Sequence, residues 1–201
     1  MAFGLQNSTY YLPLTTYYLL PMLPLLFLLS EILLAIFKKS QKQETKENAD
    51  RSSLRMLWLV ILSSVAISVF LMFQFPRGAE YACVGKIGSV IMFVGLILRW
   101  TAIIQLGKSF TVDVAIGKSQ QVMQSGLYGI VRHPSYTGLL LLFFGLSLYF
   151  NTWFAIPVIN IPVIIALSYR IRIEEEALTR HFGDAYTAYC RKVKRVIPFV
   201  W

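Results

Sequence analysis

Apolar runs without Asp, Glu, Lys or Arg recur along this chain, and several are sixteen residues or longer. Each approaches the ~20 residues with which a helix crosses a bilayer. Hydrophobic residues make up 56% of the 201 residues, above the ~45–50% of an ordinary soluble domain. The sequence therefore predicts an all-α, integral-membrane helical bundle.

About five transmembrane helices are expected, in a single membrane domain over residues 1–201. The expected spans are 17–37, 54–75, 81–104, 134–150 and 153–169. The region 1–105 then holds three N-terminal spans and a charged linker, and 106–201 holds two spans and a C-terminal helix. Because no basic region precedes the first apolar run, we expect no cleavable signal peptide.

Prolines and a short connection shape two of these spans. Pro21 and Pro24 are expected to kink the first span, and Pro157 and Pro162 to bend the fifth. Residues 151–152 permit only a tight turn, so the last two spans are predicted to form a helical hairpin.

Polar and small residues mark the other spans. The charges of segment 38–55 predict a mobile linker. Gly88 and Gly95 share one face of the third span, which favours close packing against another helix.

Glu31 is the one acid in the first span, and an acid inside a membrane is a candidate functional residue. Its closeness to Lys38 leaves a reach toward the interface equally open.

The net charge of +9 indicates an anionic counterpart. The bases flank apolar spans instead of forming a soluble basic face, so lipid headgroups are expected and nucleic acid is not. Segments 38–55, 99–132 and 170–201 hold 17 of the 19 Lys and Arg residues. The positive-inside rule then predicts an outside N-terminus and a cytoplasmic C-terminus.

The cysteine and histidine pattern does not favour a metal site. Cys83 and Cys190 lie far apart without a Cys-x-x-Cys pair, and the chain has two histidines. We assign neither cysteine a catalytic role.

A polar, Gly-bracketed segment, residues 126–138, lies between apolar runs. Gly126 and Gly129 permit a close ligand approach, and Pro134 fits the first turn of a helix. The N–H groups of that turn, with His133, Ser135 and Tyr136, form a donor cluster suited to a carboxylate or another anion. An anchor at headgroup depth is an equally open interpretation.

The tail continues the fifth span as an amphipathic surface helix. Its pattern recurs at three- and four-residue steps with a break at Gly183, and residues 197–201 follow as an apolar anchor. Arg170 and Glu174 share one face of this helix. They form either an ordinary ion pair or, facing a cavity, a site in which the guanidinium fork binds a carboxylate.

Several motifs, in order, resemble the isoprenylcysteine carboxyl methyltransferase family, whose members are integral-membrane enzymes that use S-adenosylmethionine. The resemblance covers about residues 95–201, whereas the N-terminal half supplies apolar spans and resembles nothing in particular. It rests on segments 132–138 (RHPSYTG) and 170–175 (RIRIEE), Phe182-Gly183, Tyr186, Tyr189 and Ile197-Pro198.

The resemblance implies roles for individual residues in methyl ester formation on a lipophilic, prenylated acceptor. It assigns acceptor binding to Arg170 and donor binding to Glu174. Further donor contacts are implied at Gln120, Gln121, Val122, Met123, Tyr128, His133, Pro134, Ser135 and Tyr136. Many members have His-x-Leu-Val where this chain has Gln-Gln-Val-Met at 120–123, so the adenine pocket departs from the family pattern. Arg132 is left outside the set, with lipid phosphate or Glu175 as its partner.

A carboxylate acceptor is already ionised at neutral pH, so methyl transfer to it requires no general base.

Three alternative functions stay open. A phospholipid N-methyltransferase presents an amine, for which the Arg170 fork is the wrong partner. A sterol-reductase-like protein has additional spans, and a non-catalytic membrane scaffold would not bind S-adenosylhomocysteine.

Overall fold

The computed structural model describes residues 22–37, 48–74, 82–107 and 122–198. Its regular structure in these ranges is helical, apart from one isolated β-bridge. The helices are α2 (Met22–Phe37), α3 (Asn48–Gln74), α4 (Ala82–Leu106), η3 (Gly126–Gly129), α5 (Pro134–Tyr149), α6 (Ala155–Phe182) and α7 (Asp184–Lys192).

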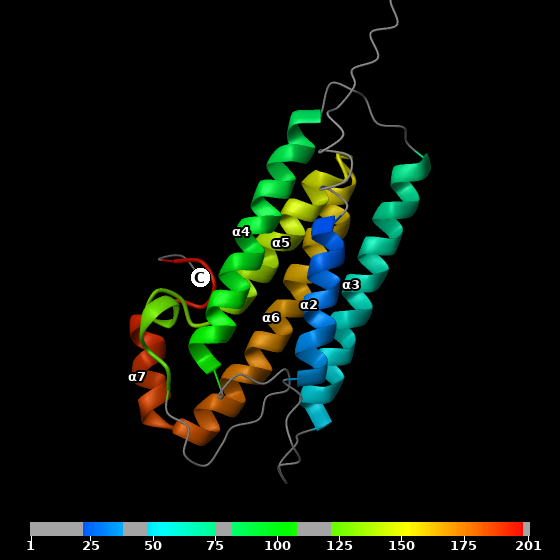
Figure 1. Ribbon diagram of the computed structural model, residues 1–201. Coiled ribbons are helices and arrows are strands. Elements are labelled where there is room, and N and C mark those ends of the chain that lie inside the picture. Colours follow the sequence, from blue (N-terminus) through cyan, green and yellow to red (C-terminus); the bar gives the residue numbers. More distant parts are fainter. Residues whose placement is uncertain (1–21, 38–47, 75–81, 108–121, 199–201) are drawn as a thin grey trace, which may run out of the picture.

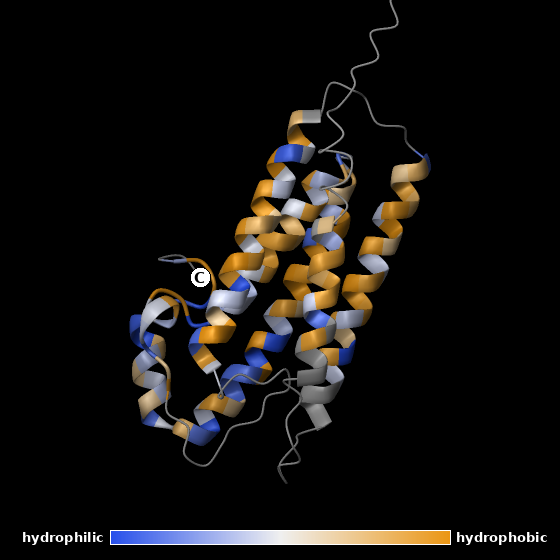
Figure 2. Ribbon diagram, in the orientation of Figure 1, coloured by the Kyte–Doolittle hydropathy of each residue, from blue (hydrophilic) through white to orange (hydrophobic). Residues whose placement is uncertain are grey.

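Helices α2 to α6 lie side by side in one bundle, and α7 lies beside one end of it (Figure 1). Within the described ranges, three helices, α3, α4 and α6, are long and apolar enough to cross a membrane, and α5 is a shorter apolar helix. Apolar residues cover the bundle while polar residues gather at the α7 end (Figure 2). The predicted all-α membrane bundle is confirmed, and the count of five crossings stays a prediction.

Helices α4 and α5 pack with almost no space between their backbones. A Cβ atom added to Gly88 would lie 2.6 Å from the Gly145 carbonyl oxygen, and one added to Gly95 would lie 2.7 Å from that of Gly138. Glycines on both helices thus face the partner's backbone, which allows the close approach that small residues permit in membranes. The predicted packing face of Gly88 and Gly95 is confirmed.

The apolar core fills the space between helices α2 to α6. Phe143 of α5 is almost fully buried, and its ring meets that of Phe27 of α2 edge to face, with centroids 5.7 Å apart. Ile159 and Val163 of α6 are fully buried in the same cluster. This packing places the polar ends of α5 and α6 next to each other.

One local expectation was wrong. Helix α3 begins at Asn48, so part of the predicted mobile linker 38–55 is helical; extending a helix satisfies backbone groups near the membrane without new partners. Pro24 lies within α2, whose description starts at Met22, so the predicted kink of the first span stays a prediction. Residues 38–47 and Pro21 lie outside the described residues.

The ends of α5 and α6 follow the prediction more closely. Helix α5 begins at Pro134 and reaches α6 through residues 150–154, so the hairpin is confirmed. Pro157 lies in the first turn of α6, and Pro162 lies inside this helix. Helix α6 ends before Gly183, whose φ of +54° favours glycine, so the predicted break between α6 and α7 is also confirmed.

Gly88→Ala is expected to destabilise the protein, because overpacking costs about 1–3 kcal/mol against a helix-propensity gain of up to ~1 kcal/mol. Gly85→Ala is the matched control, since its Cβ atom would meet Tyr149 at an ordinary 3.7 Å. Thermal unfolding in detergent measures both. A Gly88→Ala protein as stable as Gly85→Ala would contradict the close α4–α5 contact.

Candidate active site

The turn before α5 is tied to the end of α4. Gly126 has a φ of +61°, and the Gln105 side chain occupies the space that a Cβ atom would need. The Leu127 N–H donates to Gln105 Oε1 at 3.0 Å. Glycine at position 126 therefore permits both the backbone conformation and the close contact with α4.

Two buried tyrosines hold this turn in place through hydrogen bonds to main-chain carbonyls. The Tyr128 hydroxyl donates to the Ala102 carbonyl at 3.3 Å, and the Tyr189 hydroxyl donates to the Tyr128 carbonyl at 2.6 Å. Burial raises the pKa of Tyr128 above its usual range and that of Tyr189 to about 12. Both phenols are therefore protonated at neutral pH and remain donors.

The C-terminal segment, residues 193–198, runs beside the turn. Val131 and Lys194 form a parallel bridge, and the N–H groups of Arg132 and His133 donate to the carbonyls of Lys194 and Arg195 at 2.7 and 2.9 Å. Residues 194 and 195, which precede the predicted apolar anchor 197–201, thus pair with the turn in an extended conformation, and the anchor itself stays a prediction. Residues 199–201 lie outside the described residues.

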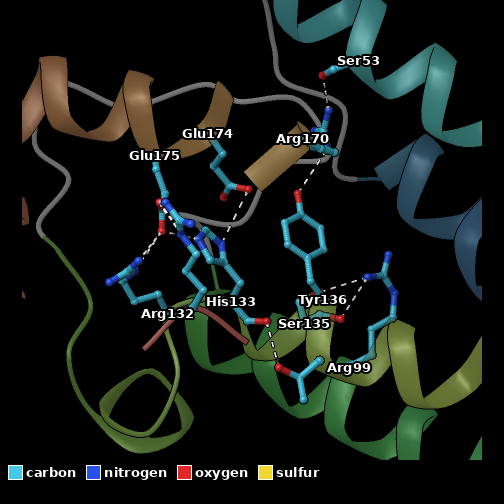
Figure 3. A network of polar contacts seen from close by, with 11 residues as sticks. Ser53, Arg99, Arg132, His133, Ser135, Tyr136, Arg170, Glu174 and Glu175 are labelled. Atoms are coloured by element: carbon cyan, nitrogen blue, oxygen red, sulfur yellow. Dashed lines mark hydrogen bonds and ion pairs between the residues drawn. The ribbon is translucent and has the colours of Figure 1, made fainter. Parts of the chain in front are cut away.

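The carboxylate of Glu175 joins the turn, α6 and the C-terminal segment. Its Oε1 accepts from Arg132 Nε at 2.8 Å and from His133 Nε2 at 3.2 Å (Figure 3). Its Oε2 accepts from Arg195 Nε at 2.9 Å. Arg132 also donates to the carbonyls of Cys190 and Val193 at the end of α7. Of the two partners considered for Arg132, the structure gives Glu175.

The same carboxylate orients the His133 ring. Because a carboxylate oxygen accepts and does not donate, Nε2 of His133 carries the proton. The other ring nitrogen, Nδ1, lies 3.8 Å from Glu174 Oε2. His133 also stacks on Tyr136, with ring centroids 5.6 Å apart at 19°.

Arg170 is almost fully buried, 3% exposed, beside this turn. Its Nε donates to the Tyr136 hydroxyl at 3.1 Å, and its Nη1 donates to Ser53 Oγ of α3 at 3.0 Å (Figure 3). Because Arg170 is buried, it does not resemble an arginine in an ordinary ion pair on the surface of a helix. Instead, three helices hold its plane in one orientation.

Glu174, one turn further along α6, carries an unsatisfied oxygen. Its Oε2 is buried and has no hydrogen-bond partner within the described part of the chain. A buried acceptor without a partner is costly, and its presence in a native site calls for an explanation. It is suited to the ammonium or hydroxyl groups of a bound molecule.

The structure brings most of the predicted residues together. His133, Pro134, Ser135 and Tyr136 begin α5 next to Arg170 and Glu174 (Figure 3), and Tyr128 supports their turn. Val122 packs against the cluster of Tyr186, Tyr189 and Val193, with Met123 beside it in the chain. Gln120 and Gln121 lie outside the described residues.

A second buried charge pair lies next to this site and was not predicted. Glu31 of α2 is 6% exposed and binds Arg99 of α4, whose guanidinium also reaches Ser135. Of the two alternatives left open for Glu31, the structure favours a buried residue inside the bundle over a reach toward the interface, because Arg99 binds its carboxylate there.

Sequence reasoning also missed Ser53 and Arg195. Ser53 lies 117 residues from Arg170 and in the half of the chain that resembled nothing, so no local pattern marks it. The opposite charges of Glu31 and Arg99 in two apolar spans were a usable signal, since such residues usually pair. An apolar bundle that buries these charged groups is typical of an integral-membrane protein with a functional polar site.

Comparisons with known proteins agree with this class. A profile of the isoprenylcysteine carboxyl methyltransferase (ICMT) family matches residues 88–180. Protein-S-isoprenylcysteine O-methyltransferase B of Arabidopsis thaliana is 32% identical over 142 residues, which are 70% of this chain and 70% of that protein. A probable protein-S-isoprenylcysteine O-methyltransferase of Oryza sativa subsp. japonica is 30% identical over 128 residues, covering 63% of this chain and 67% of that protein.

The fold is shared with a solved structure of the eukaryotic intramembrane Ras methyltransferase ICMT. The TM-score is 0.69 at 24% sequence identity, over 95% of this chain and 70% of that chain. The chain belongs to the isoprenylcysteine carboxyl methyltransferase family. It is a membrane methyltransferase, as the resemblance implied.

Glu175→Gln is expected to loosen the contact between the turn and the C-terminal segment, because glutamine loses charge-assisted hydrogen bonds worth about 1.5–3 kcal/mol each. The amides of Arg132 and His133, bonded to residues 194 and 195, should then exchange with deuterium about tenfold faster or more. Glu176→Gln, an exposed neighbour, is the control. Equal exchange in both variants would mean that Glu175 does not hold this contact.

Proposed function

We propose that this enzyme transfers a methyl group from S-adenosylmethionine to the carboxylate of a lipophilic, prenylcysteine-type acceptor and so forms a methyl ester. One observation carries the proposal: a buried guanidinium, Arg170, is fixed beside Glu174 and the His133–Tyr136 turn. A cationic fork and an unsatisfied carboxylate oxygen thus lie side by side. They suit two different ligands, an anion and a cation.

The donor is proposed to lie along the start of α5. The Oε2 atom of Glu174, which is buried and makes no hydrogen bond within the described residues, fits the ammonium or ribose hydroxyls of S-adenosylmethionine. His133, Pro134, Ser135 and Tyr136 would contact the donor at the turn, and Tyr128 would hold the turn in place. Val122 and Met123, with Gln120 and Gln121, are proposed for the adenine; the apolar contacts of Val122 with Tyr186 and Tyr189 support this.

The acceptor carboxylate is proposed to bind Arg170. A guanidinium presents its donors in one plane and binds a carboxylate through two parallel hydrogen bonds. Tyr136 and Ser53 fix that plane before any ligand arrives, which reduces the ordering cost of binding. The lipophilic part of the acceptor would lie among the apolar helices.

S-adenosylmethionine supplies an electrophilic methyl group on a sulfonium. The residues of this chain are asked mainly to align two reactants and exclude water. No proton has to be removed from an ionised carboxylate, so Glu174 and His133 need not act as bases. An anion attacking a cation disperses charge in the transition state, and the buried setting of Arg170 favours that dispersal.

An amine acceptor, as in a phospholipid N-methyltransferase, fits this site less well. The group that would bind the acceptor is Arg170, which carries a positive charge beside Tyr136. A guanidinium has no acceptor for an amine and repels an ammonium. The geometry therefore favours the carboxylate.

We also propose that the site faces the cytoplasm, because 17 of the 19 Lys and Arg residues fall in segments 38–55, 99–132 and 170–201, which the expected five-helix topology puts on one side of the membrane. A tag after Trp201 should then be digested in sealed inside-out vesicles, whereas a tag before Met1 should be protected. Protection or digestion of both tags together would contradict the orientation.

Arg170→Lys is expected to impair transfer although it conserves the charge, because lysine lacks the planar fork. A lost charge-assisted hydrogen bond of ~1.5–3 kcal/mol predicts a roughly ten- to hundredfold lower kcat/KM for a prenylcysteine acceptor. Binding of S-adenosylhomocysteine, measured by calorimetry, should change much less. Arg172→Lys, exposed on the same helix, is the matched control and should behave as the parent.

Two outcomes would overturn the assignment. An Arg170→Lys enzyme that methylates the acceptor as well as the parent would remove the role of Arg170. A parent enzyme that methylates lipophilic amines and leaves prenylcysteine carboxylates unmodified would overturn the reaction class.

A further inference from the structure

We propose that Arg99 is a positioning residue for the donor-binding turn and that Glu31, on the N-terminal helix α2, holds it in place. The inference rests on the proposed function, since the turn matters only if it binds the methyl donor. It assigns a task to a buried ion pair that the mechanism above does not use.

The contacts form a chain from α2 through α4 to α5. Arg99 Nε donates to Glu31 Oε1 at 2.6 Å, and its Nη2 donates to Glu31 Oε2 at 2.8 Å. Its Nη1 donates to Ser135 Oγ at 3.0 Å and to the Ser135 carbonyl at 3.4 Å (Figure 3). All three residues are less than 9% exposed.

Stability alone does not account for this pair. Removing two charges from water inside an apolar bundle costs several kcal/mol per ion, and such pairs are often replaced by apolar residues without loss of stability. Ionisable residues within membrane helices usually serve a function. The presence of Glu31 and Arg99 is therefore better explained by what Arg99 does at Ser135.

The geometry shows what that task is. The two-pronged contact with Glu31 fixes the guanidinium plane and directs Nη1 at the second residue of α5. Because Arg99 donates to Ser135 Oγ, it occupies an acceptor site of this hydroxyl and favours an orientation in which the hydroxyl donates to a ligand. The contact with the Ser135 carbonyl also fixes the main chain next to His133.

Helix α2 thereby contributes to the donor site indirectly: Glu31 binds Arg99, and Arg99 binds Ser135. Helix α2 also packs against α5 through the ring contact between Phe27 and Phe143. Glu31 lies outside residues 88–180, the part matched by the family profile. The N-terminal span is thus part of the active-site architecture in this chain.

Paired replacement separates positioning from folding. In Glu31→Leu/Arg99→Met both charges are removed, so no buried charge is left unpaired and the protein should keep its thermal midpoint. We expect the Kd for S-adenosylhomocysteine and the KM for the donor to rise about tenfold or more, with little change in kcat or in acceptor KM. Lys86→Met, at the other end of α4, is the control and should change none of these.

Two further variants test the route through Ser135. Ser135→Ala should weaken donor binding, and adding it to the double variant should weaken binding by less than the sum of the two separate effects, because both changes remove the contact between Arg99 and Ser135 Oγ. Arg99→Lys keeps the charge for Glu31 but cannot span Glu31 and both Ser135 acceptors, so it should also raise the donor KM. If the double variant does not fold, Arg99→Lys and Ser135→Ala carry the same comparison.

A folded double variant, or a folded Arg99→Lys, with the parent's donor affinity would overturn this inference and leave the proposed function intact. Additive effects of Arg99 and Ser135 replacement would likewise exclude action through Ser135. A parent enzyme that binds no S-adenosylhomocysteine would instead overturn the proposed function.

Discussion

The carboxylate of Glu175 holds together three parts of the chain that are distant in sequence. It binds Arg132 and His133 of the turn and Arg195 of the C-terminal segment, while its own helix carries Arg170 and Glu174. With these contacts in place, His133 presents one ring nitrogen toward Glu174 and stacks on Tyr136. The geometry of the proposed donor and acceptor positions therefore depends on one buried anion.

Around this anion, the N-terminal helices complete the site from the other side. Ser53 of α3 binds the guanidinium of Arg170, and Glu31 of α2 binds Arg99, which contacts Ser135. Glycines at the α4–α5 contact bring Arg99 close enough to do so, since a Cβ atom on Gly138 would lie 2.6 Å from the Arg99 backbone nitrogen. Helix packing and site geometry are thus set by the same residues.

Features encoded by neighbouring residues could be predicted from the sequence. Pro134 marks the start of α5, Gly183 separates α6 from α7, and Gly88 marks a close helix contact. The partners of Arg170 and Glu31 could not be predicted from the sequence, because Ser53 lies 117 residues from Arg170 and Arg99 lies 68 residues from Glu31. Such contacts depend on which helices become neighbours, and apolar spans carry little information about that choice.

The central claim, ester formation on an acceptor carboxylate, is tested most directly by the chemistry of the product. The purified protein in lipid nanodiscs would receive methyl-labelled S-adenosylmethionine with an S-farnesylcysteine acceptor, its carboxamide, or a lipophilic amine of matched chain length. The account predicts label only with the free carboxylate, in a product that releases methanol in mild alkali. Alkali-stable label on the amine, or equal labelling of the carboxamide, would contradict it.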